Sequence, residues 1–426
     1  MEIRNIRWPD EQEAILEHIR LVHGPGDSDL LGKWYGTMPG FDPADCFVIE
    51  GDNGEIAAHT MLVPRQMQFG HSVFQASEIG VVGTLETYRG RGYATALMER
   101  ALERMTERGD ALSVLFGIPN FYERWGYEYA VGLYLTSFES SIETELALKA
   151  GKWDPSHGHL RRISNQLGIR NRDITVRPFD LNDLPDVMAL YAEASALGHS
   201  SIARDEQTWA WQLNYMADIG RADSSSFLVA EADDGSLLAY LRLVESAPVN
   251  WFRDDSCRFS VIEFAGNDPD ATEALLAQAA SFARDYAAER IGLYVHPDSR
   301  LMTHALARGA ALRSFTGAGF LRLNDLSLTL EGLADTLKDR LDRSPYAGQA
   351  IRLQLSSERE SGEVMLGSGK AEAVPLEAPA ADLIRLFSGW FGISNLDSGS
   401  HLTKQAPLLQ ILFPRSDSKV AIADLI

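Results

Sequence analysis

Cysteine is scarce in this 426-residue sequence. Only Cys46 and Cys257 are present, and they lie far apart in the chain. Two distant cysteines provide neither a disulfide framework nor a CxxC pair for metal or redox chemistry. Such sparse use of cysteine is typical of a reducing compartment, and we therefore expect a cytoplasmic protein.

Long apolar runs and an excess of positive charge are also missing. No stretch approaches the ~18 consecutive apolar residues of a membrane span, and we expect no signal peptide, since the N-terminus lacks an apolar core with a cleavage site. Lysine and arginine number 39 against 60 aspartates and glutamates, a net charge of −21. Nucleic-acid binding needs clustered basic residues, so we expect neither a nucleic acid nor a membrane as partner. The acidic balance is compatible with a cationic substrate, or simply with solubility.

Two short motifs for metal or nucleotide chemistry are incomplete. His157 and His159 form an HxH pair without a third ligand nearby, which does not make a metal site. The segment GSGK, ending at Lys370, lacks the first glycine and the following Ser or Thr of a phosphate loop. We expect a hairpin turn at GSGK and no metal cofactor.

What the sequence does have is α/β periodicity, over a length that suggests two or three domains. Helical and strand patterns alternate to about residue 140, and from Ile174 the same order of elements returns. We interpret this as an internal repeat of one α/β module whose sequence has diverged. The polar residues 141–172 are predicted to be a linker. From about Thr329 onward, alternating strands, turns and a helix are predicted.

The most informative stretch is ETYRGRGYATALMERALERM, residues 86–105. After Gly92, apolar residues recur at helical spacing, and Gly109 is placed to end the helix. The first turn of a helix leaves backbone amides unpaired, and the helix dipole adds about half a positive charge there. Gly90 and Gly92 let the backbone approach a ligand closely. The stretch predicts a main-chain pocket for a phosphate or pyrophosphate; a plain strand-to-helix turn is the alternative.

The spacing Arg89-x-x-Gly92-x-Ala94, after the apolar strand IGVVGTL, resembles the signature of the Gcn5-related N-acetyltransferase (GNAT) superfamily. It is neither GxGxxG nor GxxxxGK[ST], which argues against a dinucleotide or a nucleoside triphosphate. The resemblance implies acetyl-coenzyme A as co-substrate. It also implies a β-bulge that splays this strand from the next, and Gly83 suits such a bulge. By resemblance, the cofactor contacts are Val82, Gly83 and Thr84 in the strand, and Arg89, Gly90, Arg91, Gly92, Tyr93, Ala94 and Thr95 in the loop.

A second motif, FYERWGYEYA at residues 121–130, resembles the Tyr-x-(Arg/Lys)-(Phe/Trp)-Gly-(Tyr/Phe) element of the enhanced-intracellular-survival (Eis) type of GNAT protein. In that type the first tyrosine is the general acid that reprotonates the departing thiolate, and it falls on Tyr122. A phenol with a pKa near 10 can donate to a thiolate within hydrogen-bond reach. The alternative is an aromatic cluster that closes the core, which we prefer for Phe121, Trp125 and Tyr127.

The resemblance to the Eis type covers essentially the whole chain. It implies an α/β (α+β) fold with a catalytic GNAT domain at 1–140, the linker at 141–172, a degenerate GNAT-like domain at 173–328 and a sterol-carrier-protein-2-like domain at 329–426. In the second module the loop position carries Asp268, Pro269 and Asp270. Two carboxylates would repel a pyrophosphate, and proline removes an amide donor. We therefore predict one active site per chain.

The Eis type also implies an unusual base, the C-terminal carboxylate of the chain itself. The last seven residues, VAIADLI, are apolar apart from Asp424, as a buried tail should be. Ile426 departs from the terminal aromatic residue expected in that type, and a final strand of the third domain is the alternative. The resemblance further implies homo-oligomers such as trimers or hexamers.

These observations predict transfer of an acetyl group from acetyl-coenzyme A to a primary amine on a small cationic acceptor, such as a polyamine or an aminoglycoside, by direct attack. By resemblance, the strand amide near Val82 would be the oxyanion donor. Asp27 and Asp29 lie where GNAT enzymes shape the acceptor pocket, although solvated turn residues are the simpler interpretation. The alternatives are a non-catalytic acyl-CoA sensor or lipid-binding module, and a protein lysine acetyltransferase.

Overall fold

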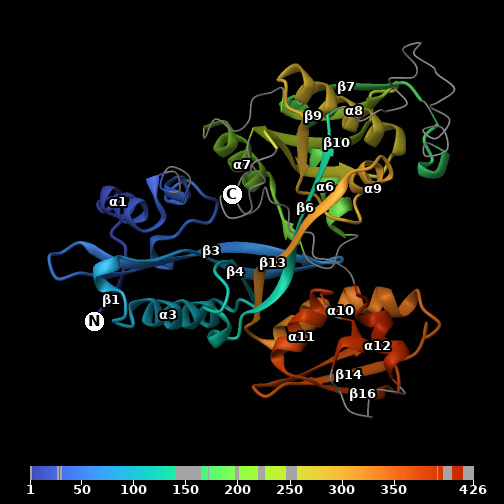
Figure 1. The fold of residues 1–426 in the computed structure, drawn as a ribbon. Coiled ribbons are helices and arrows are strands. Elements are labelled where there is room, and N and C mark those ends of the chain that lie inside the picture. Colours follow the sequence, from blue (N-terminus) through green and yellow to red (C-terminus); the bar gives the residue numbers. More distant parts are fainter. Residues whose placement is uncertain are drawn as a thin grey trace. The chain divides into compact units, whose positions relative to one another are not determined.

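The computed structural model describes residues 2–25, 28, 31–140, 165–170, 172–196, 201–218, 226–245, 257–390, 392–396 and 405–415. The chain divides into two compact units. The first contains residues 1–131, 198–215 and 317–418, and the second contains 132–197, 216–316 and 419–426. The mixed α/β fold class is confirmed (Figure 1). The domain boundaries drawn from the sequence stay a prediction, and in the structure the third segment packs in the same unit as the first.

The first unit contains a mixed sheet whose strand order is β1-β2-β3-β4-β5-β13. All neighbours are antiparallel except β4 and β5, and that parallel pairing covers only Ala76–Glu78 with Leu112–Val114. The short strand β8 (Ser201–Ala203) pairs with β3. The strands are β1 (Ile3–Asn5), β2 (Cys46–Glu50), β3 (Ile56–Phe69), β4 (Ser72–Thr84), β5 (Leu112–Phe116) and β13 (Ala311–Leu323).

Helices α1 (Gln12–His23) and α3 (Tyr93–Arg108) pack on β3 and β4, and Figure 1 shows them on opposite sides of these strands. The helical spacing predicted after Gly92 is confirmed, since Leu97, Met98, Ala101 and Met105 are buried. Gly109 ends α3 in the left-handed conformation, with φ 72°, as its position predicted. The chain therefore runs from the end of β4 through the glycine loop into α3, which packs along the sheet.

The third segment forms a separate three-stranded sheet, covered on one face by α10 and α11 (Figure 1). The strand order is β15-β14-β16, so the turn at GSGK joins two strands that lie on either side of β14. The expectation of a hairpin turn there is wrong, because β15 and β16 each pair with β14 rather than with one another. The elements are α10 (Leu326–Asp342), β14 (Ile351–Ser356), β15 (Ser361–Leu366), β16 (Glu372–Glu377), α11 (Ala380–Phe387) and α12 (Ala406–Leu412).

Helix α10 fastens this segment to the β3–β4 hairpin of the first sheet. Thr336 Oγ1 accepts hydrogen bonds from the backbone amides of His71 and Ser72, both at 3.1 Å, and donates to the Phe69 carbonyl at 2.9 Å. Gly332 lies so close to the Phe74 ring that a methyl group there would overlap it. These contacts hold the third segment against the β3–β4 hairpin.

The second unit repeats the order of elements found in the first. Its sheet has the order β6-β12-β11-β10-β9-β7. Strands β11 and β12 pair in parallel over three residues, as β4 and β5 do, and β10 and β11 shift register between Arg242 and Leu243. The elements are β6 (Glu128–Glu139), β7 (Ile174–Pro178), α6 (Leu184–Ala196), α7 (Glu206–Asp218, shared with the first unit), β9 (Phe227–Ala232), β10 (Leu237–Glu245), β11 (Phe259–Gly266), α8 (Pro269–Asp285), β12 (Arg290–Leu293) and α9 (Arg300–Ala307).

Candidate active site

The start of α3 has the geometry of an anion cradle. Gly92 is its N-cap, no side chain caps the helix, and Gly90 and Gly92 have φ angles of 77° and 81°. A methyl group added at either glycine would meet nothing within 4 Å. The amides of the first turn thus have no capping side chain, and the two glycines border open space, so the residues present fit a pyrophosphate at this position.

The equivalent helix of the second unit, α8, is capped by its own chain. Asp268 accepts hydrogen bonds from the amides of Asp270 and Ala271 at 3.0 and 2.9 Å, and Pro269 occupies the first turn. Arg172 forms ion pairs with both carboxylates. In α8 the Asp268 carboxylate thus binds first-turn amides, whereas the corresponding amides of α3 have no side-chain cap. The two repeats differ at this point.

Strand β4 carries a β-bulge directly before the loop. Met61 pairs with Gly80 and His59 pairs with Gly83, so Val81 and Val82 together lie opposite one residue of β3. The sequence predicted the bulge at Gly83, and this position is wrong: Val81 has the left-handed φ of 53°. A β-branched residue rarely adopts that conformation, which costs of order 1–3 kcal/mol and often marks a functional site.

The bulge lies where β4 has left its neighbour β5. The parallel pairing ends at Glu78 and Val114, whereas β4 continues to Thr84. The two strands thus diverge over the half of β4 that leads into the glycine loop. The backbone of β4 from the bulge onward is available to the pantetheine arm of a coenzyme A thioester, as the resemblance implied for Val82, Gly83 and Thr84.

Side chains around the glycine loop hold it in place. The Arg91 guanidinium lies over the Tyr88 ring, 4.7 Å from its centroid, and forms an ion pair with Asp52 at 3.4 Å. The Tyr88 hydroxyl accepts from the Asp52 amide at 2.8 Å and donates to Glu55 at 2.5 Å. Tyr93 stacks on Tyr88 at 5.9 Å between centroids. Arg91 therefore brings positive charge to the exposed loop while supporting it.

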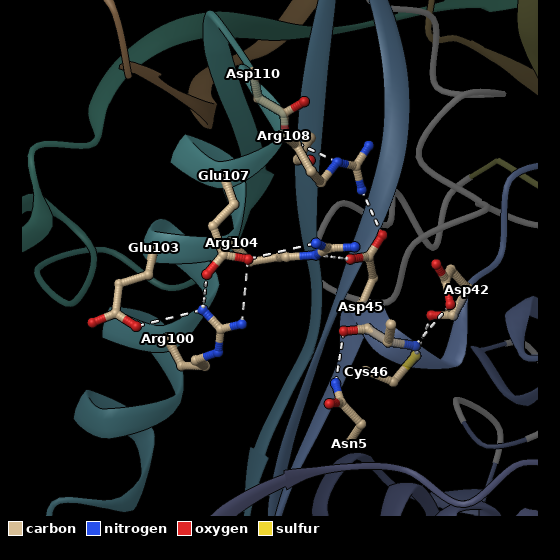
Figure 2. Close-up of polar contacts among 12 residues, drawn as sticks. Asn5, Asp42, Asp45, Cys46, Arg100, Glu103, Arg104, Glu107, Arg108 and Asp110 are labelled. Atoms are coloured by element: carbon tan, nitrogen blue, oxygen red, sulfur yellow. Dashed lines mark hydrogen bonds and ion pairs between the residues drawn. The ribbon is translucent and has the colours of Figure 1, made fainter.

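Helix α3 is anchored at its other end by a cluster of charges (Figure 2). The buried carboxylate of Asp45 accepts from Arg104 Nε at 2.7 Å and from Arg108 Nη1 at 2.6 Å. Arg100 and Arg104 both contact Glu107 on the outer face of the helix. Asp45 directly precedes β2, so these contacts tie α3 to the edge of the sheet and fix where its N-terminus points.

Tyr122 lies at the start of the short 3₁₀ helix η4 (Glu123–Trp125), between β5 and β6. Its ring is 8% exposed and packs against Gly117 and the Phe121 and Phe320 rings. Burial raises the pKa of Tyr122 to about 12, so the phenol keeps its proton. Among the described residues, its hydroxyl has no hydrogen-bond partner and is free to donate.

Tyr127 behaves as a core residue, as preferred from the sequence. It is fully buried, and its hydroxyl shares a hydrogen bond of 2.6 Å with Ser113 Oγ. Phe121 and Trp125 pack against the same core. Tyr122 is thus a buried residue whose hydroxyl, unlike that of Tyr127, has no hydrogen-bond partner among the described residues.

Three arginines hold the segment that follows Tyr122. Arg322 Nε donates to the Trp125 carbonyl at 2.8 Å. Arg359 lies against Gly126, with Nη1 2.6 Å from the place of an added methyl group, and Arg385 forms an ion pair with Glu128. Arg359 and Arg385 belong to the third segment and Arg322 to β13. Sequence reasoning missed all three, because isolated arginines in strands, turns and helices carry no motif.

Several residues named from the sequence lie outside the described residues. These are Ile426, the HxH pair His157 and His159, and the loop carboxylates Asp27 and Asp29. Within the described ranges, no group of three or more His, Cys, Asp or Glu side chains could hold a metal ion. In the same ranges no helix is long and apolar enough to cross a membrane.

The comparisons with known proteins agree with this geometry. Residues 2–130 match the family model described as an acetyltransferase (GNAT) domain, and no curated protein matches the sequence. The chain resembles a GCN5-related N-acetyltransferase from Kribbella flavida (18% identity, TM-score 0.67, covering 98% of this chain and 99% of that one). It also resembles a GCN5-related N-acetyltransferase from Anabaena variabilis (16% identity, TM-score 0.67, covering 98% of this chain and 99% of that one). Eis1 from Mycobacterium abscessus is similar as well (17% identity, TM-score 0.63, covering 98% of each chain).

At such low identities the structural likeness shows the fold. Together with the match over residues 2–130 and the uncapped loop before α3, it defines the class of the protein. The N-terminal part is a GNAT acetyltransferase domain. The chain is an acetyl-CoA-dependent N-acetyltransferase.

Proposed function

We propose that this enzyme transfers the acetyl group to a primary amine on a small cationic acceptor, such as a polyamine or an aminoglycoside, by direct attack. The main support for the proposal is the uncapped start of α3. It follows strand β4, which carries a β-bulge and no longer pairs with β5 at that point. The net charge of −21 favours the approach of a cationic acceptor.

Each residue of the site has a defined task in this reaction. When bound, acetyl-CoA supplies an activated acetyl thioester. The amides of residues 90–95 hold its pyrophosphate, and the β4 amide near Val82 donates to the thioester oxygen. As the acceptor nitrogen bonds to the carbonyl carbon and the carbon–sulfur bond breaks, the Tyr122 phenol donates its proton to the sulfur. The C-terminal carboxylate of Ile426 takes the proton that the amine loses.

The finer organisation of the protein belongs to the same proposal. We assign the third segment to the sterol-carrier-protein-2-like type, as the resemblance implies. The contacts of its Arg359 and Arg385 with Gly126 and Glu128, together with that of Arg322 in β13 with Trp125, support a role in positioning the Tyr122 segment. A cytoplasmic location and assembly into trimers or hexamers complete the proposal. Light scattering on the purified chain measures the assembly state directly.

Free-thiol release from acetyl-CoA tests the function against a panel of aminoglycosides, polyamines, aryl-alkylamines and lysine peptides. We expect turnover with at least one small cationic amine. Turnover only with lysine peptides would favour a protein lysine acetyltransferase. Silence across the panel, with acetyl-CoA still binding tightly, would favour an acyl-CoA sensor or a lipid-binding module.

A further inference from the structure

The turn that leads from β5 to Tyr122 contains a residue in an unfavourable backbone conformation. Asn120 has the left-handed φ of 61°. Asparagine enters this region more readily than most residues do, but the conformation still costs of order 1 kcal/mol. Residues 118–120 are all exposed, so burial of their side chains does not hold the turn in place. Its conformation therefore depends on a specific contact.

Glu123 provides this contact. Its Oε1 accepts a hydrogen bond from the Asn120 amide at 2.9 Å. Glu123 follows Asn120 by three residues, the spacing at which a glutamate reaches back to a backbone amide in a capping box. Hydrogen bonds to a carboxylate are about twice as strong as those between neutral groups. The Glu123 side chain thus closes a ring of chain that contains Phe121 and Tyr122.

The same turn lies directly against the Tyr122 ring. A methyl group at Gly117, where the turn begins, would lie 2.3 Å from Tyr122 Cε2. The Phe121 ring meets the Tyr122 ring edge to face, with 4.9 Å between centroids. Gly117 therefore contacts the phenol ring, and Glu123 fixes the backbone that carries it. A change in the conformation of the turn would move the Tyr122 hydroxyl.

The second carboxylate oxygen of Glu123 makes no comparable contact. Oε2 is buried and has no hydrogen-bond partner among the described residues. Leaving a buried polar atom unpaired costs about 1–3 kcal/mol, and more where the group is charged. A side chain that served stability alone would not carry this cost. The hydrogen bond at Oε1 is therefore the main contribution of Glu123, and a glutamine could keep it without the charge.

We propose that Glu123 is a positioning residue for Tyr122: by holding the Asn120 amide it fixes the turn against which the phenol ring lies, and with it the place of the hydroxyl. The inference rests on the proposed function, in which Tyr122 donates its proton to the departing sulfur. Glu123 acts through position rather than through its charge, since burial is what raises the pKa of Tyr122.

Two substitutions separate the hydrogen bond from the charge. Glu123→Ala removes both, whereas Glu123→Gln keeps an oxygen that can accept from the Asn120 amide. With spermidine as acceptor, we expect kcat to fall about 10- to 100-fold in Glu123→Ala and to stay within about threefold of the wild type in Glu123→Gln. The dissociation constant for acetyl-CoA should stay unchanged in both, because the loop before α3 is left intact. Glu331→Ala, at an exposed position of α10, is the control and should keep kcat.

A second variant guards against misfolding of Glu123→Ala. Glu123→Asp keeps the charge but withdraws the carboxylate from the Asn120 amide by one methylene, and we expect kcat to fall here too. Equal kcat in the Ala, Asp and Gln variants, whether lowered or normal, would overturn the inference, because only the glutamine can keep the hydrogen bond.

NMR of the full chain with ¹³C-labelled tyrosine Cζ reports the place of the phenol without turnover. The signal that disappears in Tyr122→Phe belongs to Tyr122. We expect this signal to shift or broaden in Glu123→Ala and to keep its wild-type position in Glu123→Gln. An unmoved signal in Glu123→Ala would overturn the inference and leave the proposed function standing. A moved signal in an enzyme that acetylates no amine would support the positioning of Tyr122 and overturn the proposed function.

Discussion

At the scale of single residues, Tyr122 is set apart from its neighbours by what its hydroxyl does. Phe121 and Trp125 have no hydroxyl, and that of Tyr127 is committed to Ser113. Tyr122 combines burial with a donor that has no partner among the described residues, which suits a group that transfers its proton during the reaction.

Replacing Tyr122 by phenylalanine removes the proton donor and breaks no hydrogen bond to the part of the chain that the structure describes. We expect kcat to fall by about 10²- to 10⁴-fold, the usual range for a general acid, with acetyl-CoA affinity and thermal stability near those of the wild type. Tyr127→Phe is the matched control. It loses the Ser113 bond, costs about 1 kcal/mol of stability and keeps kcat. Equal activity of both variants would remove Tyr122 from the mechanism.

The pH dependence of turnover reports the same group. Since burial raises the pKa of Tyr122 to about 12, the folded enzyme holds this proton where an ordinary phenol, with a pKa near 10, would lose it. We expect kcat at saturating substrates to show no alkaline decline from Tyr122 up to about pH 10.5. The tighter binding of this proton also favours the folded state, and that contribution is lost as pH rises from about 10 to 12. An alkaline limb near pH 9 that disappears in Tyr122→Phe would contradict this assignment.

At the scale of elements, the candidate cofactor site is the junction of β4 and α3. The glycines at the two ends of α3 have similar left-handed angles, 81° at Gly92 and 72° at Gly109, but only the first faces the expected pyrophosphate. This symmetry provides a way to separate backbone strain from binding.

Gly92→Ala and Gly109→Ala should cost similar stability, about 1 kcal/mol each, because alanine disfavours the left-handed region. Only Gly92→Ala places a methyl group in the cradle, and we expect its dissociation constant for acetyl-CoA to rise about tenfold or more. Calorimetric titration and thermal melts of the pair measure both effects. Equal affinities would show that the pyrophosphate binds elsewhere.

The elements predicted from the sequence were those marked by local patterns. The period of α3, its end at Gly109 and the strands on either side are determined by neighbouring residues, so the pattern suffices. The bulge was assigned to Gly83 because glycine tolerates positive φ. In the structure the register with β3 and the packing of Gly83 against His18 place it at Val81, and neither is encoded locally.

At the scale of the whole molecule, arginines of β13 and of the third segment contact the residues that follow Tyr122, and no sequence motif indicated these contacts. The GSGK segment predicts a hairpin turn, but β15 and β16 both pair with β14, and this pairing depends on tertiary packing. The arginines that reach Trp125, Gly126 and Glu128 are separated from Tyr122 by about half of the chain. Such contacts depend on how segments pack, so the sequence indicates Tyr122 as a candidate proton donor but does not indicate the arginines that contact the residues after it.

Weakening this support should reduce catalysis without reducing cofactor binding. Arg322→Lys shortens the donor to the Trp125 carbonyl and removes the planar guanidinium. We expect kcat to fall about tenfold or more, since a displacement of about 1 Å at a reacting group costs up to about 100-fold, while the dissociation constant for acetyl-CoA stays unchanged. The exposed Arg343→Lys serves as control. A loss of stability with normal kcat would mean that Arg322 only packs.

The most direct test of the whole account measures two products of one reaction. Acetyl-CoA and spermidine are incubated with the enzyme, and free coenzyme A thiol and acetylated amine are quantified together. We expect one acetylated amine for each thiol released, and the loss of both in Tyr122→Phe. Thiol release without acetylated amine, or tight acetyl-CoA binding without either product for every amine tried, would contradict it.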